Sequence, residues 1–163
     1  MSPTTDSFGK FPPEIPVPSN QTTYTLKPGL YAVHGLESPP KAGAFQLLND
    51  GTIAIYEGEP GGAAAAPDRL SPVYTLANGG SLAVPTGLIF LRLAEEIPVA
   101  ERREAVGAAG YHVVEILSYA PNAAWLRAQS GSIADALKGT KELEKIPGVE
   151  NVEPQMLMVA ARR

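Results

Sequence analysis

The chain has 163 residues, enough for one full domain or two small ones, and its 13 basic and 17 acidic residues give a net charge of −4. This balance leaves no excess positive charge for a phosphate backbone, so we expect no nucleic-acid partner. The absence of cysteine excludes disulfides, thiol catalysis and thiolate zinc sites. No long apolar or basic amphipathic stretch predicts membrane binding. Because no basic region precedes an apolar core at the start, we expect a cytoplasmic protein.

The composition of the first half of the chain predicts a flexible tail followed by β-structure. Residues 1–21 are rich in proline, which fixes φ and removes backbone donors, and predict a flexible, extended tail. Residues 22–87 predict a small all-β region with hairpins at Asn-Asp-Gly (49–51) and Asn-Gly-Gly (78–80). Residues 58–67 predict an exposed loop between the two hairpins.

From residue 88 onward, strand and helix patterns alternate. Strands are predicted at 88–93, 111–119, 123–128 and 149–152, and helices at 98–110 and 132–146. This βαββαβ order predicts a ferredoxin-like antiparallel plait over 88–155, with both helices on one sheet face and the other face uncovered. The expected fold class is therefore α+β, with a small N-terminal all-β region before the plait and a tail at 156–163.

Both predicted helices carry boundary signals. Pro98 suits a first helical position and Gly110 a helix end. Ser132 is a predicted N-cap, with Asp135 three residues later as a short form of the capping box. The predicted buried face of the second helix comprises Ile133, Ala136, Leu137, Leu143 and Ile146.

No residue pattern points to catalysis or to a metal. The two histidines, His34 and His112, fall in different predicted domains, and no Gly-x-Ser-x-Gly turn accompanies a serine. An enzyme would need perturbed titratable groups gathered in a cleft, which the sequence does not show. We therefore predict no catalytic residue, no metal and no cofactor, and a protein that binds or assembles.

Four segments in a fixed order resemble the propeptides of subtilisin-like serine proteases, most closely the fervidolysin-type prodomains. They are Leu-Ile-Phe-Leu-Arg-Leu (88–93), Tyr-His-Val-Val-Glu-Ile-Leu (111–117), Asn-Ala-Ala-Trp-Leu-Arg-Ala (122–128) and Ile-Pro-Gly-Val-Glu-Asn-Val-Glu-Pro-Gln (146–155). The resemblance covers about residues 86–160, and its sharpest part is 147–154. It implies a propeptide-like inhibitor, and a folding chaperone, whose partner is a subtilisin-like serine protease.

The resemblance also implies how the partner is bound. Family propeptides lay the uncovered sheet face on two surface helices of the protease and insert the C-terminal tail into the active-site cleft. Here the primary specificity pocket would receive Arg163 or, in another register, Ala160 or Ala161. An alternative is that 156–159 simply extend the sheet. The implied protease-binding tail consists of Met156, Leu157, Met158, Val159, Ala160, Ala161, Arg162 and Arg163.

Strand alternation gives candidates for the docking face without deciding which side is outward. Successive side chains of 111–119 point to opposite faces, so one set is Tyr111, Val113, Glu115, Leu117 and Tyr119. The candidates of the other set, with Trp125 of the neighbouring strand, are His112, Val114, Ile116 and Trp125. The alternative function is a non-catalytic regulatory or oligomerisation module that forms a homo-oligomer through the uncovered face.

Overall fold

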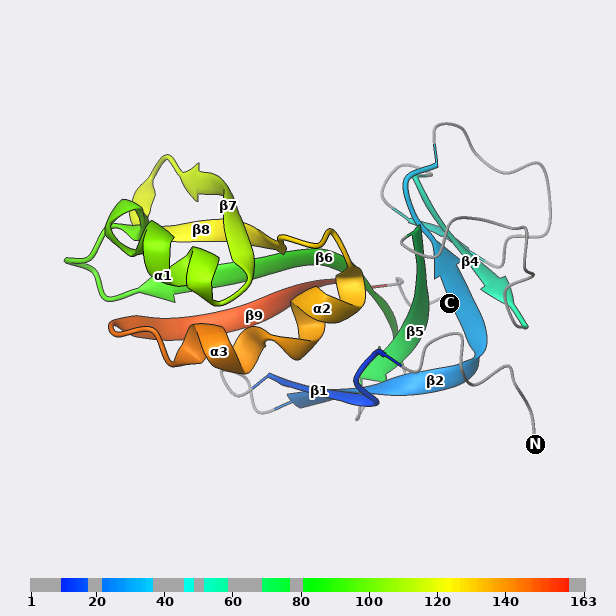
Figure 1. Ribbon diagram of the computed structural model, residues 1–163. Coiled ribbons are helices and arrows are strands. Elements are labelled where there is room, and N and C mark those ends of the chain that lie inside the picture. The colour runs from blue at the N-terminus through cyan, green and yellow to red at the C-terminus, as the bar shows by residue number, and fades with distance from the viewer. Residues whose placement is uncertain are drawn as a thin grey trace. The chain divides into compact units, whose positions relative to one another are not determined.

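The structure, a computed structural model, describes residues 10–17, 22–36, 46–48, 52–58, 69–76 and 81–158 (Figure 1). Two compact units are present: unit 1 combines Met1–Pro85 with Met156–Arg163, and unit 2 is Thr86–Gln155. Parts of the sequence predictions lie outside the described residues, namely 1–9 and 18–21 of the Pro-rich tail, both hairpin turns, and 59–67 of the predicted loop.

Unit 1 is built from antiparallel strands. They are β1 Glu14–Val17, β2 Thr22–Val33, β3 Gln46–Leu48, β4 Ile53–Glu57, β5 Leu70–Leu76 and the first part of β6 Leu82–Leu93. β2 is central, because it pairs with β1, β4 and β5. The predicted hairpin partners do pair, since Leu48 lies opposite Ile53 and Thr75 opposite Leu82.

Part of the segment predicted as a flexible tail belongs to this sheet. Residues Glu14–Val17 form β1, and the Ile15 and Val17 side chains are buried. The Pro12 carbonyl accepts a hydrogen bond from the Tyr74 hydroxyl at 2.7 Å, and the Pro13 carbonyl accepts one from the Leu26 amide at 2.9 Å. Proline lacks an N–H but keeps a carbonyl acceptor, so a Pro-rich segment can still pair along a sheet edge.

The core of unit 1 lies on one face of these strands. It contains the buried side chains Ala32, Ile53, Ile55, Val73 and Val84. Three partly buried leucines pack against this cluster: Leu30, Leu82 and Leu157. The last of them comes from the far end of the chain, so the C-terminal residues contribute to the core of unit 1.

Unit 2 contains the rest of β6 and the elements that follow it. They are the 3-10 helix η4 Val99–Arg102, α1 Arg103–Ala108, β7 Tyr111–Leu117, β8 Ala120–Ala128, α2 Ile133–Lys138, α3 Thr140–Glu144 and β9 Val149–Met158, whose last three residues belong to unit 1. The predicted buried face of the second helix is confirmed, since all five of its residues are buried. The helix itself is divided at Gly139 into α2 and α3.

The predicted N-cap at Ser132 is confirmed, but the capping box includes a third residue, Ser130. The Ser132 hydroxyl accepts from the Asp135 amide at 3.1 Å. The Asp135 carboxylate does not reach back to the Ser132 amide; it accepts from the Ser130 hydroxyl at 2.7 Å, and that oxygen accepts the Ser132 amide at 3.1 Å. Ser130 therefore relays the contact that a longer glutamate makes directly.

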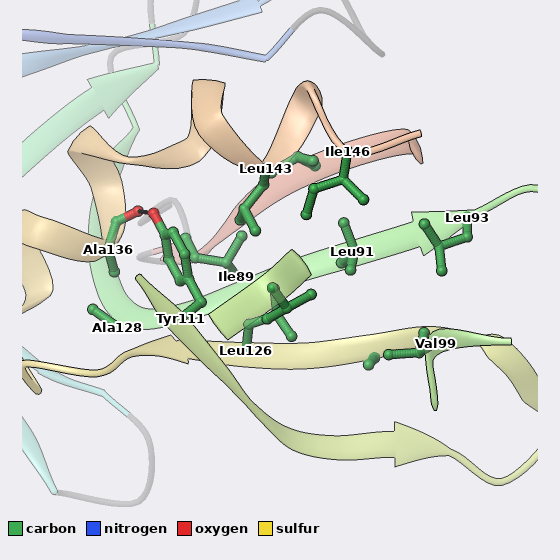
Figure 2. Close-up of a cluster of buried hydrophobic side chains, with 13 residues drawn as sticks. Ile89, Leu91, Leu93, Val99, Tyr111, Leu126, Ala128, Ala136, Leu143 and Ile146 are labelled. Carbon is green, nitrogen blue, oxygen red and sulfur yellow. Dashed lines mark hydrogen bonds between the residues drawn. The ribbon is translucent and has the colours of Figure 1, made fainter. Parts of the chain in front are cut away.

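The helices pack on one face of the unit 2 sheet. Figure 2 shows Ile89 and Leu91 of β6 together with Leu126 of β8, beneath Leu143 and Ile146. The other members of this cluster are Leu93, Val99, Val106, Tyr111, Ala124, Ala128, Ala136 and Val152. Alternate residues of β6 and β8 supply the sheet side of the core, as the period of a strand requires.

The expected fold class is wrong. Strands make up 57% of the structure and helices 19%, so the protein is mostly antiparallel β and not an α+β protein with a ferredoxin-like plait. Within the described residues nine strands are joined by pairing, and β6 pairs with β5 near its start and with β8 further on. The change of pattern predicted at residue 88 falls within β6, which runs from Leu82 to Leu93 through Pro85 and Gly87. Gly87 has φ +94°, which a glycine adopts without steric cost, so the strand continues.

The close approach of Gly139 to Tyr111 gives a first test of this packing. A Cβ at Gly139 would lie 2.7 Å from the Tyr111 hydroxyl oxygen, so we expect Gly139→Ala to cost about 1–3 kcal/mol in unfolding free energy. Tyr111→Phe removes that oxygen and its hydrogen bond to the Ala136 carbonyl, a loss of about 1 kcal/mol. In urea unfolding, the double variant should lose less unfolding free energy than the two single variants lose together, and the difference should be about 1 kcal/mol or more. Strictly additive losses would contradict the contact.

Candidate functional site

The sheet face of unit 2 opposite the helices carries a pair of aromatic side chains. Phe90 of β6 lies opposite Trp125 of β8 in the antiparallel register. The ring centroids are 5.4 Å apart, with an edge-to-face angle of 63°, the geometry that aromatic quadrupoles favour. Both side chains are only half-buried, because their strand neighbours Ile89 and Leu126 point the other way, into the core.

Charged side chains surround the aromatic pair. Arg92 and Arg127 lie two residues from Phe90 and Trp125 on their own strands, so they share the same face, and both are exposed. Arg127 also donates to the Thr86 carbonyl at 3.5 Å, which holds its stem along the sheet. Strand pairing adds two residues from β7. We call the resulting surface the open face: Phe90, Arg92, His112, Glu115, Trp125 and Arg127.

A β-bulge in β7 decides which β7 residues join the open face. Val113 lies opposite Leu126, but Glu115 lies opposite Trp125, so Val114 is the extra residue. A bulge shifts the alternation by one residue, and side chains beyond it change faces. Val114 itself is 48% exposed. Val113 before the bulge and Ile116 after it therefore both pack against the core.

The structure does not bring the four predicted sheet-face candidates together. His112 is exposed and lies opposite Arg127, and Trp125 lies opposite Glu115, so these two share the open face. Val114 sits at the bulge, while Ile116 lies opposite Ala124 and packs on the helix side. Strict alternation groups Ile116 with His112, and that grouping does not hold across the bulge.

The sequence analysis missed Phe90, Arg92 and Arg127. The signal that could have found them is the polar residue within each strand: Arg92 interrupts the apolar run of β6, and Arg127 that of β8. A charged side chain on a half-buried strand marks the solvent side. Stepping two residues from each arginine reaches Phe90 and Trp125.

The implied protease-binding tail divides at Met158. Met156, Leu157 and Met158 are the last residues of β9, as in the alternative that this segment extends the sheet. Leu157 is half-buried against the core cluster of unit 1, whereas Met158 is 41% exposed. The remaining tail residues lie outside the described residues: Val159, Ala160, Ala161, Arg162 and Arg163.

Two tyrosines and one histidine have buried polar contacts. Burial raises the pKa of the Tyr74 hydroxyl, and burial together with the nearby Asp135 raises that of Tyr111, whereas a hydrogen bond at Gly139 lowers it. Both phenols therefore stay protonated and donate to backbone carbonyls. His34 Nε2 lies 2.8 Å from the Ser71 hydroxyl, but Ser71 has no exposed surface, so this pair cannot meet a substrate as placed.

A hollow of about 460 Å³ lies beside Tyr111 at one end of the helix layer. Gln129 on its rim donates to the carbonyls of Gly107 and Tyr111 at 3.0 and 3.1 Å. Asp135, also on the rim, is held by the Ser130 hydroxyl. These groups join the ends of α1, β7 and β8, so their first role is to fix the chain.

The part of the chain that the structure describes holds neither a metal-binding cluster nor a membrane-spanning helix. Among the residues the structure describes, no group of three or more histidine, aspartate or glutamate side chains could hold a metal ion. No helix in the described part of the chain is long and apolar enough to cross a membrane. Comparison of the chain with protein families, curated proteins and solved structures gives no match.

Proposed function

We propose that this protein is a propeptide-like inhibitor, and an assistant in folding, of a subtilisin-like serine protease. The open face of unit 2 is the docking surface, and the C-terminal tail, Met156–Arg163, enters the active-site cleft. The observation that carries the proposal is the open face itself. Helices cover one side of the unit 2 sheet, and the other side presents a half-buried aromatic pair flanked by arginines.

The composition of the open face supports a protein partner. Tryptophan and arginine are among the residues that contribute most to protein–protein binding, especially near the centre of an interface. A large aromatic side chain buries about 150–250 Å² when it is covered, so Phe90 and Trp125 offer a substantial apolar contact. Arg92 and Arg127 sit at the margin of this contact, where they can pair with carboxylates of the partner.

The resemblance to subtilisin propeptides supports the choice of partner. Three of its segments supply the open face: Phe90 and Arg92 belong to 88–93, His112 and Glu115 to 111–117, and Trp125 and Arg127 to 122–128. Its sharpest segment, 147–154, forms most of β9 and leads the chain to Met158. An extended segment there could add as a strand to a protease cleft, where main-chain hydrogen bonds supply affinity.

A titration into a subtilisin-like protease tests the proposal. Residual activity on a small peptide substrate is the readout, with the full chain compared to a chain that ends at Met158. The shorter chain keeps all of β9, including Leu157 in the core of unit 1. We expect the full chain to inhibit, and the shorter chain to bind through the open face but lose most of the inhibition.

Two further measurements on both chains complete the test: calorimetry measures binding to the protease, and sedimentation measures the oligomeric state. If both chains bind the protease but only the full chain inhibits it, docking and occupation of the cleft are separate contributions. A full chain that neither binds nor inhibits, but sediments as a stable dimer, would refute the proposal and favour the oligomerisation module.

A further inference from the structure

The end of β9 is held by residues of unit 1. Leu157 packs against the cluster formed by Ala32, Ile55 and their neighbours. The Tyr24 hydroxyl donates to the Met158 sulfur at 3.9 Å, a weak contact with a soft acceptor. Met156 and Leu157 are half-buried, and both belong to β9, the strand that pairs with β6.

This packing conflicts with use of the same segment as a ligand. A strand that adds to a protease cleft must offer free main-chain donors and acceptors. The main chain of Met156–Met158 is already part of β9, and Leu157 would expose apolar surface on leaving its cluster. A partner that needs this segment must therefore compete with unit 1 for it.

We infer that the N-terminal β-region of unit 1 holds the C-terminal segment Met156–Met158 in place, chiefly through Leu157, and we call this arrangement the clamp. The clamp gives the N-terminal β-region a role: it withholds Met156–Met158 until a partner's cleft draws the segment out. The inference rests on the proposed function for the identity of the partner. The clamp itself is a property of the free protein and can be measured without any protease.

Hydrogen exchange of the free protein, read by mass spectrometry, tests the clamp. We compare Leu157→Ala with Leu30→Ala, which removes another partly buried leucine of the same cluster that comes from β2 and not from the C-terminal segment. Leu157→Ala should raise exchange at 156–158 about tenfold, the factor that corresponds to about 1.4 kcal/mol. Leu30→Ala should raise exchange in unit 1 generally, with no excess at 156–158.

A second readout separates the clamp from the proposed function. If a protease draws the segment out, Leu157→Ala should speed the onset of inhibition about tenfold relative to Leu30→Ala. Selective exchange at 156–158 without inhibition by any variant supports the clamp and refutes the proposed partner. Inhibition by all variants at equal rates, with equal exchange at 156–158, overturns the clamp and leaves the proposed function standing.

Discussion

Replacing Trp125 by alanine is expected to weaken inhibition of the target protease by about 100-fold, which corresponds to about 2.7 kcal/mol of binding free energy. Trp125 lies at the centre of the open face. Its ring centroid is 5.4 Å from that of Phe90, and it lies opposite Glu115 on β7. Truncation removes its own contact area and also the edge-to-face support of Phe90. The inhibition constant, measured with a peptide substrate, checks the expectation.

Two further variants distinguish lost binding from lost folding. Tyr119→Ala removes an aromatic side chain that is 83% exposed in the β7–β8 turn and is not a member of the open face, so it should leave inhibition unchanged. Arg92→Glu reverses an exposed charge beside Phe90 and should weaken inhibition about tenfold while the urea midpoint stays the same. Full inhibition by both Trp125→Ala and Arg92→Glu would show that the open face does not dock.

Much of the local structure of residues 88–152 follows from sequence pattern alone. Helix boundaries came from residues with a strong steric or capping preference, such as Ser132, whose hydroxyl does accept the Asp135 amide. The buried helix face came from a 3.6-residue period that leaves little choice of side. The division at Gly139 was not predicted, and neither was the close approach of Tyr111, whose hydroxyl oxygen would lie 2.7 Å from a Cβ at that position.

The fold class was mispredicted because local signals do not show which strands continue. The alternation of strand and helix patterns begins at residue 88, just after Pro85 and Gly87, so a boundary was predicted there. In the structure, β6 passes through both and contributes buried residues on each side, including Val84 and Ile89. Which strands join one sheet depends on pairing between distant segments, and a single sequence carries only weak information about that pairing.

The candidate site was predicted in part for a similar reason. Trp125 was found because an aromatic residue on a strand stands out, but its partner Phe90 lies in an apolar run that gives no hint of two faces until Arg92. The bulge at Val114 places Ile116 and His112 on opposite faces of the sheet. The bulge contains no glycine, the residue that often marks a bulge in a sequence. Alternation is reliable only as far as the ladder is regular.

Replacing Gly148 by alanine is expected to destabilise unit 2 by about 1.5–3.5 kcal/mol, the largest stability loss we predict. Gly148 has φ +91°, where any other L-residue is strained by about 1–2 kcal/mol. In addition, a Cβ there would lie 2.5 Å from Cδ1 of Ile97, the far end of a half-buried side chain, which can move aside at a rotamer cost of about 0.5–1.5 kcal/mol. The chain cannot move away freely, because the Gly148 carbonyl accepts from the Ala94 amide at 2.8 Å.

Gly110 provides the matched control for this substitution. Its φ of +97° imposes the same backbone strain, but nothing lies within 4 Å of the position of an added Cβ. Gly110→Ala should therefore cost only about 1–2 kcal/mol in urea unfolding, and the excess at Gly148 measures the Ile97 contact. Gly148→Ala in an Ile97→Ala background should lose that excess. Equal losses at the two glycines would mean that the turn into β9 is loose, and that the geometry at Ile97 does not determine where the last strand begins.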